Sequence, residues 1–519
     1  MIEERGGEQE LKTLGALVCF SAGILLTLTS IGCISANLSS EPLSAVAATS
    51  NPLVAQYSLN RIDQGMSAWV EFGTDTTYGR QTSVAAASVT ASGGQTINIL
   101  VAGMLPQTTY HMRAHVTWSG GSWVDQDQTF TTGALPTPLV APQVSVSHPS
   151  VAAGTTNSPA PGVELLSLTS SNTNILQAVA TDLQGNVIWY CPGGAVPIKQ
   201  LPNGDYIINN YSTLIEVDLA CRTVRQVSLN QVSQSLQAQG YSFNLINFSH
   251  DVLVLPSGHW IGLLQISQNF TDLPGYPGTL EVLGDLLVDI DPNGNVVWNW
   301  SAFDYLDVNR HLFGLPDWTH SNALVYTPDG NLLLSMRNQS WILKINYANG
   351  TGSGNLLWTL GEDGDFTIMG GDPSQWFYGQ HNPNIVSASG SQTTLTVFDD
   401  GDLRIDSTGV ACGSSSSAPA CYSRGTIFQI DESTYLATLL WEDIPGLYTP
   451  WGGSIGVLSN GDVEFDMSSP FPTEPAASQI MEFTQTSDPQ SVWQMVITGT
   501  NAYRGIRIPS LYPGVTWTQ

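Results

Sequence analysis

Charged side chains are scarce in this chain, and basic ones are the scarcest. Only 11% of the 519 residues are charged, against about 25% in an average soluble protein. Fifteen Lys and Arg stand against 43 Asp and Glu, a formal net charge of −28. A field of that sign repels nucleic-acid phosphates and anionic lipid surfaces. We therefore expect no nucleic-acid partner, and we expect any anionic substrate to need a local positive pocket.

Cysteine is also scarce, with six in the whole chain. Cys19 and Cys33 fall in an apolar segment near the N-terminus, and the other four contain no CxxC pair that would suggest a zinc or redox site. An even number of cysteines outside the cytoplasm is typical of disulfides. We expect two pairs; the alternative is four free, buried thiols. The expected pairs are Cys191 with Cys221 and Cys412 with Cys421.

A long hydrophobic run occurs once, at residues 14–34, after Arg5 and Lys12. Residues 1–36 therefore resemble an export segment, with three alternatives: a cleaved signal peptide, an uncleaved membrane anchor, or a lipoprotein signal with Cys33 as the acylated residue. All three place the chain outside the cytoplasm, in the periplasm or at the cell surface. The membrane would be contacted only through this segment or its lipid.

The chain is rich in glycine, with 50 residues, and 15 Trp, 17 Tyr and 15 Phe supply material for hydrophobic cores. This composition predicts a turn-rich, all-β protein. Residues 51–133 alternate apolar and polar positions in short runs, which predicts a β-sandwich. The fragments EFGTDTTYG, GMLPQTTYHMRAHV and TFTT resemble a fibronectin type III domain. Residues 134–161 are rich in proline and read as a linker.

From residue 162 to residue 519 the chain repeats a unit of some 50 to 70 residues. Each unit has a turn such as Pro202-Asn203-Gly204, then apolar strands, then a strand that carries Trp. Six such units predict a six-bladed β-propeller, whose innermost strands line a central channel. A stacked β-helix would need shorter and more regular repeats. The C-terminal AYRGIRIPSLY is expected to add a strand to the incomplete first blade and close the ring.

Three of the eight histidines occupy one repeat position, at the start of an innermost strand. They are His250, His320 and His381, and we expect them to meet at one mouth of the channel. Arg337 ends the next strand after His320 and would make the site suitable for an anion. One alternative is that the histidines are inherited packing residues. Another is a metal site, although neither HxH nor HExxH spacing supports it.

The ordered motifs DWTHSNALVYTPDGNLLLSMRNQS, GQHNP and LTVFDDGDLR resemble the bacterial arylsulfate sulfotransferases. The resemblance covers about residues 165–519 and includes the YRGIRIPSLY tail. It implies an exported six-bladed propeller that transfers a sulfuryl group from an aryl sulfate to a phenol, with no cofactor and no metal. It also implies a disulfide between Cys412 and Cys421. The fibronectin-like N-terminal part and the wording of GQHNP and FDDG depart from the common family pattern.

Residue by residue, the resemblance implies that His381 is the nucleophile that becomes sulfated. His250, His320 and Arg337 would bind sulfate oxygens and assist proton transfer, and Asn322 would help bind the substrate. An imidazole that is neutral near pH 7 is chemically suited to this attack. Two other functions stay open: a noncatalytic adhesion or ligand-binding propeller, and a metal-dependent lyase or hydrolase. The sequence does not indicate an oligomeric state.

Overall fold

The computed structural model describes residues 41–89, 95–152, 158–193, 197–405, 409–413, 421–470 and 477–518. Strands dominate these residues and helices are few and short, so the prediction of an all-β protein is confirmed. Residues 1–36 and Cys33 lie outside the described part, and the three expectations for this segment stay predictions. No helix in the described part of the chain is both long and apolar enough to cross a membrane.

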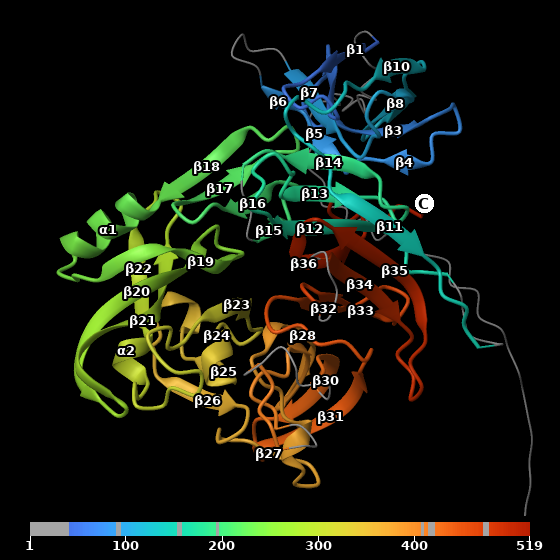
Figure 1. Ribbon diagram of the computed structural model, residues 1–519. Coiled ribbons are helices and arrows are strands. Elements are labelled where there is room, and N and C mark those ends of the chain that lie inside the picture. Colours follow the sequence, from blue (N-terminus) through green and yellow to red (C-terminus); the bar gives the residue numbers. More distant parts are fainter. Residues whose placement is uncertain are drawn as a thin grey trace, which may run out of the picture.

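Two antiparallel sheets form the N-terminal part, drawn blue and teal in Figure 1. The first, in the order β1-β2-β7-β6, comprises β1 (Leu43–Ala48), β2 (Ala55–Asn60), β7 (Gln95–Val101) and β6 (Ser88–Val89). The second, in the order β10-β8-β3-β4, comprises β10 (Gln128–Thr131), β8 (Thr109–Trp118), β3 (Ser67–Gly73) and β4 (Arg80–Gln81), with β5 (Ala85–Ala86) on β3 and β9 (Gly121–Val124) on β8. Alternate residues of β3 and β8 are buried, as expected of strands with one face on a core. Both sheets contribute to one hydrophobic cluster.

Six further sheets follow, which we number 1 to 6 along the chain. Sheet 1 has the order β14-β13-β12-β36: β14 (Val187–Cys191), β13 (Ala178–Thr181), β12 (Val163–Thr169), β36 (Asn501–Ile508). Sheet 2 has β15 (Ile198–Gln200), β16 (Tyr206–Asn209), β17 (Thr213–Val217), β18 (Thr223–Ser228). Sheet 3 has β19 (Asn244–Val254), β20 (Trp260–Leu273), β21 (Tyr276–Ile290), β22 (Val296–Ser301).

Sheet 4 has β23 (Ser321–Tyr326), β24 (Leu332–Met336), β25 (Trp341–Ile345), β26 (Leu356–Leu360). Sheet 5 has the order β27-β31-β30-β29-β28: β27 (Thr367–Ile368), β31 (Leu436–Asp443), β30 (Arg424–Asp431), β29 (Gln392–Asp399), β28 (His381–Ser389). Sheet 6 has the order β11-β35-β34-β33-β32: β11 (Gln143–Ser147), β35 (Ser491–Thr498), β34 (Ala477–Phe483), β33 (Val463–Met467), β32 (Ser454–Val457).

The short helices lie between strands. They are α1 (Leu229–Ala238), α2 (Ala302–Tyr305), η1 (Arg337–Gln339), η2 (Ala348–Gly350) and η3 (Pro373–Gln375). Helix α1 begins at a capping box, in which Ser228 and Gln231 satisfy each other's backbone N–H groups.

The six sheets succeed one another around a common centre, the arrangement that a six-bladed propeller requires (Figure 1). Their innermost strands are β36, β15, β19, β23, β28 and β32, and contacts link neighbouring sheets round the ring. As the sequence predicted, the C-terminal strand β36 pairs with β12 and completes sheet 1. Strand β11 adds a second link by pairing with β35 at the outer edge of sheet 6. The boundaries 51–133, 134–161 and 162–519 stay predictions.

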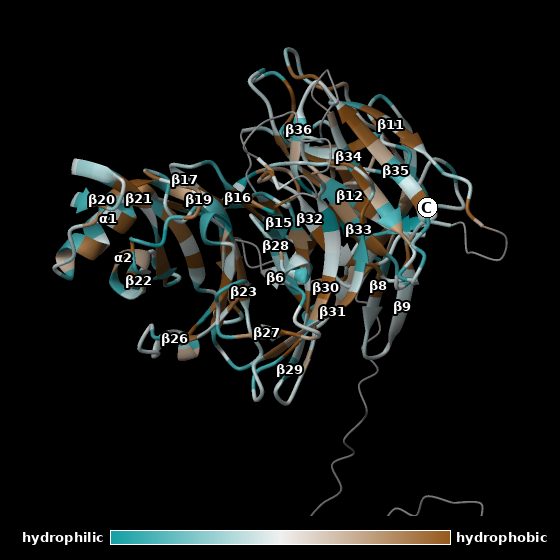
Figure 2. Ribbon diagram, turned by 60° about the horizontal axis from the view of Figure 1, so that its bottom comes forward, coloured by the Kyte–Doolittle hydropathy of each residue, from teal (hydrophilic) through white to brown (hydrophobic). Residues whose placement is uncertain are grey.

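Hydrophobic residues run along the strands and pack the sheets against their neighbours (Figure 2). The recurring Trp of the outer strand adds a hydrogen bond between sheets. Its indole N–H donates to a carbonyl of the next sheet: Trp189 to Leu219 O, Trp298 to Gly352 O, Trp441 to Thr486 O and Trp493 to Leu183 O. This explains why Trp recurs at one position of the repeat.

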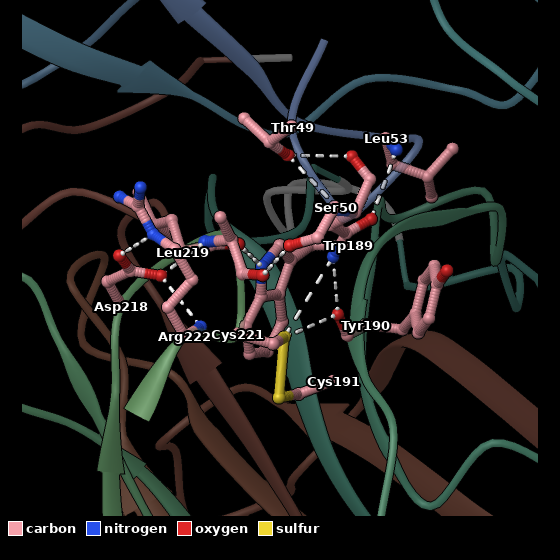
Figure 3. The surroundings of a disulfide bond; sticks show 12 residues. Thr49, Ser50, Leu53, Trp189, Tyr190, Cys191, Asp218, Leu219, Cys221 and Arg222 are labelled. Atoms are coloured by element: carbon pink, nitrogen blue, oxygen red, sulfur yellow. Dashed lines mark hydrogen bonds and ion pairs between the residues drawn. A yellow bond between two sulfur atoms is a disulfide. The ribbon is translucent and has the colours of Figure 1, made fainter. Parts of the chain in front are cut away.

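Both expected disulfides form, Cys191 with Cys221 and Cys412 with Cys421. The first joins β14 of sheet 1 to the turn after β17 of sheet 2 (Figure 3). The N-terminal part reaches the same place, because Asn51 Nδ2 donates to Tyr190 O over 2.9 Å and Ser50 Oγ to Ala220 O over 3.3 Å. The disulfide therefore lies where the N-terminal sheets meet the ring.

Candidate active site

The structure brings His250, His320 and His381 together at one end of the ring. The ring centroids of His250 and His320 are 4.8 Å apart, and the phenol ring of Tyr503 lies 5.5 Å from His250 and 6.0 Å from His381. The histidines come from or beside β19, β23 and β28, three successive innermost strands. The three histidines therefore lie close together, as the sequence predicted.

Irregular pairing shapes this end of the ring. The register shifts beside His250 in β19, at Asn322 in β23, just after His381 in β28 and at Tyr503 in β36. Bulges of this kind re-aim side chains and are frequent next to active sites. At Tyr503 the bulge lets two successive residues, Tyr503 and Arg504, both approach the histidines.

His381 is the most buried of the three imidazoles, with 2% of its surface exposed. Its Nδ1 lies 2.7 Å from Oδ2 of Asp400, and its Nε2 accepts a 3.3 Å hydrogen bond from the backbone N–H of Gly452. Since Nε2 is an acceptor, Nδ1 carries the proton and donates to Asp400. Burial, together with the charge of Arg337, holds the pKa of His381 well below its usual value, so the ring is neutral.

Asp400 is fully buried, and only one of its two oxygens is hydrogen-bonded within the described residues. Burial raises the pKa of this carboxyl, and the nearby Asp402 raises it further. Arg337 acts in the opposite direction. The His381–Asp400 pair therefore favours a neutral imidazole that gains a stabilising partner when positive charge develops on the ring.

His320 differs from His381 in being partly open, with 29% of its side chain exposed. Its Nδ1 lies 2.5 Å from Oδ2 of Asp317. Burial alone would raise the pKa of Asp317, but the hydrogen bond and charge of His320 lower it. Asp317 is thus a carboxylate held against the imidazole. His320 has a left-handed backbone with φ of 48°, a conformation that non-glycine residues seldom adopt outside functional sites.

His250 is held by Ser249, whose Oγ lies 2.7 Å from Nδ1. Burial, the neighbouring His320 and Arg504 lower the pKa of His250 to about 3. His250 is therefore neutral at physiological pH and acts as a hydrogen-bonding group rather than as a cation.

Arg337 directly follows β24, as the sequence predicted, and lies beside the histidines. Its Nη2 pairs with Oδ2 of Asp402 at 2.5 Å and donates to Pro450 O at 2.8 Å. Its Nε has no hydrogen-bond partner within the described residues. The guanidinium is fixed in place by these bonds and still has a donor to offer.

Arg504 is a second cation at the site that sequence reasoning missed. Its side chain is 1% exposed, and Nη2 donates to the backbone carbonyl of Asn322. Neither Nε nor Nη1 has a hydrogen-bond partner in the described part of the chain, although Nη1 lies 3.5 Å from Asp251. Buried, unpaired guanidinium donors are costly unless a ligand satisfies them. The tail motif YRGIRIPSLY contains this residue, but the sequence predicted only that this tail closes the ring.

Asn322 is completely buried next to this cation. Its Nδ2 donates to Gln380 O over 2.7 Å, while its Oδ1 has no partner among the described residues. Asn322 therefore holds the backbone just before His381 in place.

A cavity of about 420 Å³ is lined in part by residues of the innermost strands β28, β32 and β36, among them Asn382, Ile455 and Arg507.

A model of the arylsulfotransferase (ASST) family matches residues 155–504, about two thirds of the chain. The chain belongs to the arylsulfotransferase family. The family gives it arylsulfotransferase activity in general and implies an aryl sulfate donor and a phenol acceptor as partners. The match to the family model confirms the family that the sequence predicted. A search of curated proteins finds no match.

Solved structures are similar only distantly. A protein of unknown function from Bacteroides caccae is 11% identical, with a TM-score of 0.40, over 67% of this chain and all of that one. A Synechocystis ACO mutant is 11% identical, with a TM-score of 0.31, over 91% of this chain and 98% of that one.

Within the described residues, no group of three or more His, Cys, Asp or Glu side chains has a metal-binding arrangement.

Proposed function

We propose that this arylsulfotransferase moves a sulfuryl group from an aryl sulfate ester to a phenolic acceptor through a covalent intermediate on His381. The observation that carries the proposal is the environment of His381. The imidazole is buried and neutral, its Nδ1 is held by Asp400, and two guanidinium groups lie beside it. A nucleophile needs a free lone pair, and an anionic substrate needs fixed positive donors.

In the first step, Nε2 of His381 attacks sulfur, the bond from sulfur to the aryl oxygen breaks, and a phenol leaves. The N–S bond leaves a positive charge on the imidazole, which Asp400 stabilises through Nδ1–H. Nε2 must give up its long hydrogen bond from Gly452 for this attack. Donors from Arg337, Arg504 and His250 would hold the three sulfuryl oxygens, as in phosphoryl transfer.

We assign the proton transfers to His320. Its Nδ1 is fixed by Asp317 and 29% of its side chain is exposed, so we expect Nε2 to reach the aryl oxygen. It gives a proton to the departing oxygen and, in the second step, takes one from the acceptor phenol as that oxygen attacks sulfur and releases His381. Asn322 and Arg504 are positioning and binding groups in this scheme.

We further propose that residues 51–133 form a fibronectin type III-like sandwich and residues 162–519 the catalytic propeller. The strand orders β2-β7-β6 and β10-β8-β3-β4, which lie within residues 51–133, support the first assignment. Export to the periplasm or cell surface is supported by the two disulfides, which persist outside the cytoplasm.

The test is release of 4-methylumbelliferone from its sulfate ester by the purified protein, with and without added phenol, after dialysis against a chelator. The proposal predicts release that phenol accelerates and that chelation does not reduce. Release that disappears on chelation would favour the metal-dependent alternative. No release with any acceptor would favour a noncatalytic binding propeller.

A further inference from the structure

A cavity of about 300 Å³ lies between sheets 4 and 5, away from the histidines. Strand β23 runs from Ser321, next to His320, to Tyr326, and the next residue, Thr327, lines the cavity. Strand β28 likewise runs from His381 to Ser389, another lining residue. Six residues of strand span about 20 Å. The cavity therefore opens on the opposite face of the ring from the candidate active site.

The corresponding place between sheets 3 and 4 is filled by an aromatic side chain of the protein. The ring of Tyr347 packs edge-on against Trp298, with centroids 5.1 Å apart, and its hydroxyl donates to Oδ2 of Asp289 over 2.7 Å. Asp289 is the residue paired with Trp298 across the strands. The space between sheets 3 and 4 is therefore filled by the phenol ring of Tyr347, which contacts the indole of Trp298 and the carboxylate of Asp289.

Between sheets 4 and 5 the same positions hold a different set. Lys344 pairs with Trp358 across the strands, as Asp289 does with Trp298. Glu432 stands at the position that corresponds to Tyr347, because it is the third residue after Gln429 of β30, as Tyr347 is the third residue after Lys344 of β25. The Glu432 carboxylate lies 2.8 Å from Lys344 Nζ. The polar link between sheets is retained, but Glu432 puts no aromatic ring at the position of Tyr347, and Trp358 packs edge-on against Phe366 instead, with ring centroids 5.4 Å apart. A cavity beside Trp358 results.

The turn that follows also differs. Residues 346–355 connect β25 to β26, and one of their carbonyls, Gly352 O, accepts from Trp298. Residues 432–435 are all that connect β30 to β31. Trp358 Nε1 has no hydrogen-bond partner in the described part of the chain, unlike the corresponding Trp of sheets 1, 3, 5 and 6. The short turn explains both the missing acceptor and the open space.

We propose that this cavity binds a small neutral phenol, which takes the place that Tyr347 occupies between sheets 3 and 4. The ring would lie against Leu333, Ile385 and the small part of Trp358 that lines the cavity, and the hydroxyl would donate to Glu432 and accept from Lys344. A cavity of about 150 Å³ already holds benzene, so the space here suffices for a substituted ring. The site would be distinct from the reaction site, and the inference does not rest on the proposed function.

Charge selects the neutral phenol over its sulfate ester. Lys344 is paired with both Asp329 and Glu432, each at 2.8 Å, so two carboxylates surround one ammonium. Burial lowers the pKa of Lys344, but these two partners more than reverse the effect, and the ammonium stays charged. An aryl sulfate would meet a net negative wall and is excluded. Leu333, Ile385 and Pro328 complete an apolar lining.

The test follows the indole ¹⁵N–¹H signal of Trp358 in the full-length protein, assigned by its loss in Trp358→Phe, during titration with 4-fluorophenol. Ala388 is exposed and lines the cavity, so Ala388→Trp should block it. Ser387→Trp, one residue earlier on the other face of β28, is the matched control. We expect a saturable shift in the wild-type protein and the control, and binding at least about tenfold weaker in Ala388→Trp.

Fluorobenzene and phenyl sulfate complete the experiment. Fluorobenzene lacks the hydroxyl that would satisfy Glu432 and Lys344, so its binding should be at least about tenfold weaker than that of 4-fluorophenol. Phenyl sulfate, titrated into His381→Ala so that no phenol is released, should not shift the signal, and a shift would contradict the selection by charge. Turnover of an aryl sulfate by Ala388→Trp should equal that of the wild type. An unmoved Trp358 signal, an equal shift in Ala388→Trp, or equal affinity for fluorobenzene would overturn the proposal.

Discussion

At the scale of single residues, each imidazole of the site is fixed through Nδ1 by a neighbouring oxygen. The partners are Ser249 for His250, Asp317 for His320 and Asp400 for His381. A histidine held at Nδ1 has a defined ring orientation and leaves Nε2 for substrate. The three partners differ in charge and burial, which gives three chemically equal side chains different roles.

Asp400→Asn should lower turnover of an aryl sulfate about 10- to 100-fold, since an amide orients His381 but does not stabilise its positive charge. The matched control is Asp304→Asn, an exposed carboxylate on α2, which should leave turnover unchanged. Steady-state kinetics of both variants give the comparison. Full activity in Asp400→Asn would show that the buried carboxyl takes no part in the transfer.

Asp402 should set the acid limb of the pH profile. Burial raises its pKa to about 6, although Arg337 acts in the opposite direction. Asp402 is ionised above that pH and holds Arg337, and below it the protonated carboxyl holds Arg337 less firmly. We expect kcat/KM to fall as the pH drops from about 8 to about 5. In Asp402→Asn the value should be lower at neutral pH and nearly flat across this range; an unchanged profile would contradict the assignment.

At the scale of elements, the closing strand β36 does two jobs. It completes sheet 1, and it carries Tyr503 and Arg504 to the histidines and Arg507 to a buried acidic cluster. Arg507 pairs with Glu164 of β12, Glu464 of β33 and Glu482 of β34. One guanidinium thus connects the first and last sheets of the ring.

Removal of this cation should destabilise the ring. Arg507→Ala leaves three buried carboxylates without their partner, and such a loss costs about 3–5 kcal/mol of unfolding free energy. Denaturant unfolding followed by tryptophan fluorescence measures it. Arg222→Ala removes an exposed ion pair with Asp218 and should change the unfolding midpoint little. Equal midpoints for Arg507→Ala and the wild type would show that the cluster does not secure ring closure.

The elements also show what sequence patterns predict and what they miss. The repeat, the closing strand, both disulfides and the meeting of His250, His320 and His381 were predictable, because turns, cysteines and repeat positions are visible in the sequence. Arg504 was not, because alternation places neighbouring residues on opposite faces and the bulge at Tyr503 breaks that rule. Asp317 and Asp400 lie in loops or at strand ends. The orientation of their side chains depends on backbone turns, which the alternation of residues along a strand does not predict.

At the scale of the whole molecule, a strongly acidic protein surrounds a site built around Arg337 and Arg504. The net charge of −28 repels an anionic donor at a distance, and the attraction is confined to the end of the channel. The two carboxylate partners, Asp402 and Asp251, further restrict the positive field to short range.

Moderate salt should therefore raise kcat/KM for an aryl sulfate or leave it unchanged. Salt at about 0.1 M screens charges beyond about 10 Å, which weakens the repulsion by the distant surface more than the contacts in the site. Kinetics at constant pH and increasing sodium chloride measure this effect. A steep fall with salt would show that long-range attraction, rather than local contact, captures the donor.

The most direct measurement of the central claim is labelling of the protein by an aryl [³⁵S]sulfate without acceptor, followed by peptide mapping under alkaline conditions. The account predicts one label per chain on the peptide that contains His381, release of the label to added phenol, and no label on His381→Ala although that variant stays folded. Label on another residue, or normal turnover by His381→Ala, would contradict a sulfohistidine intermediate at this position.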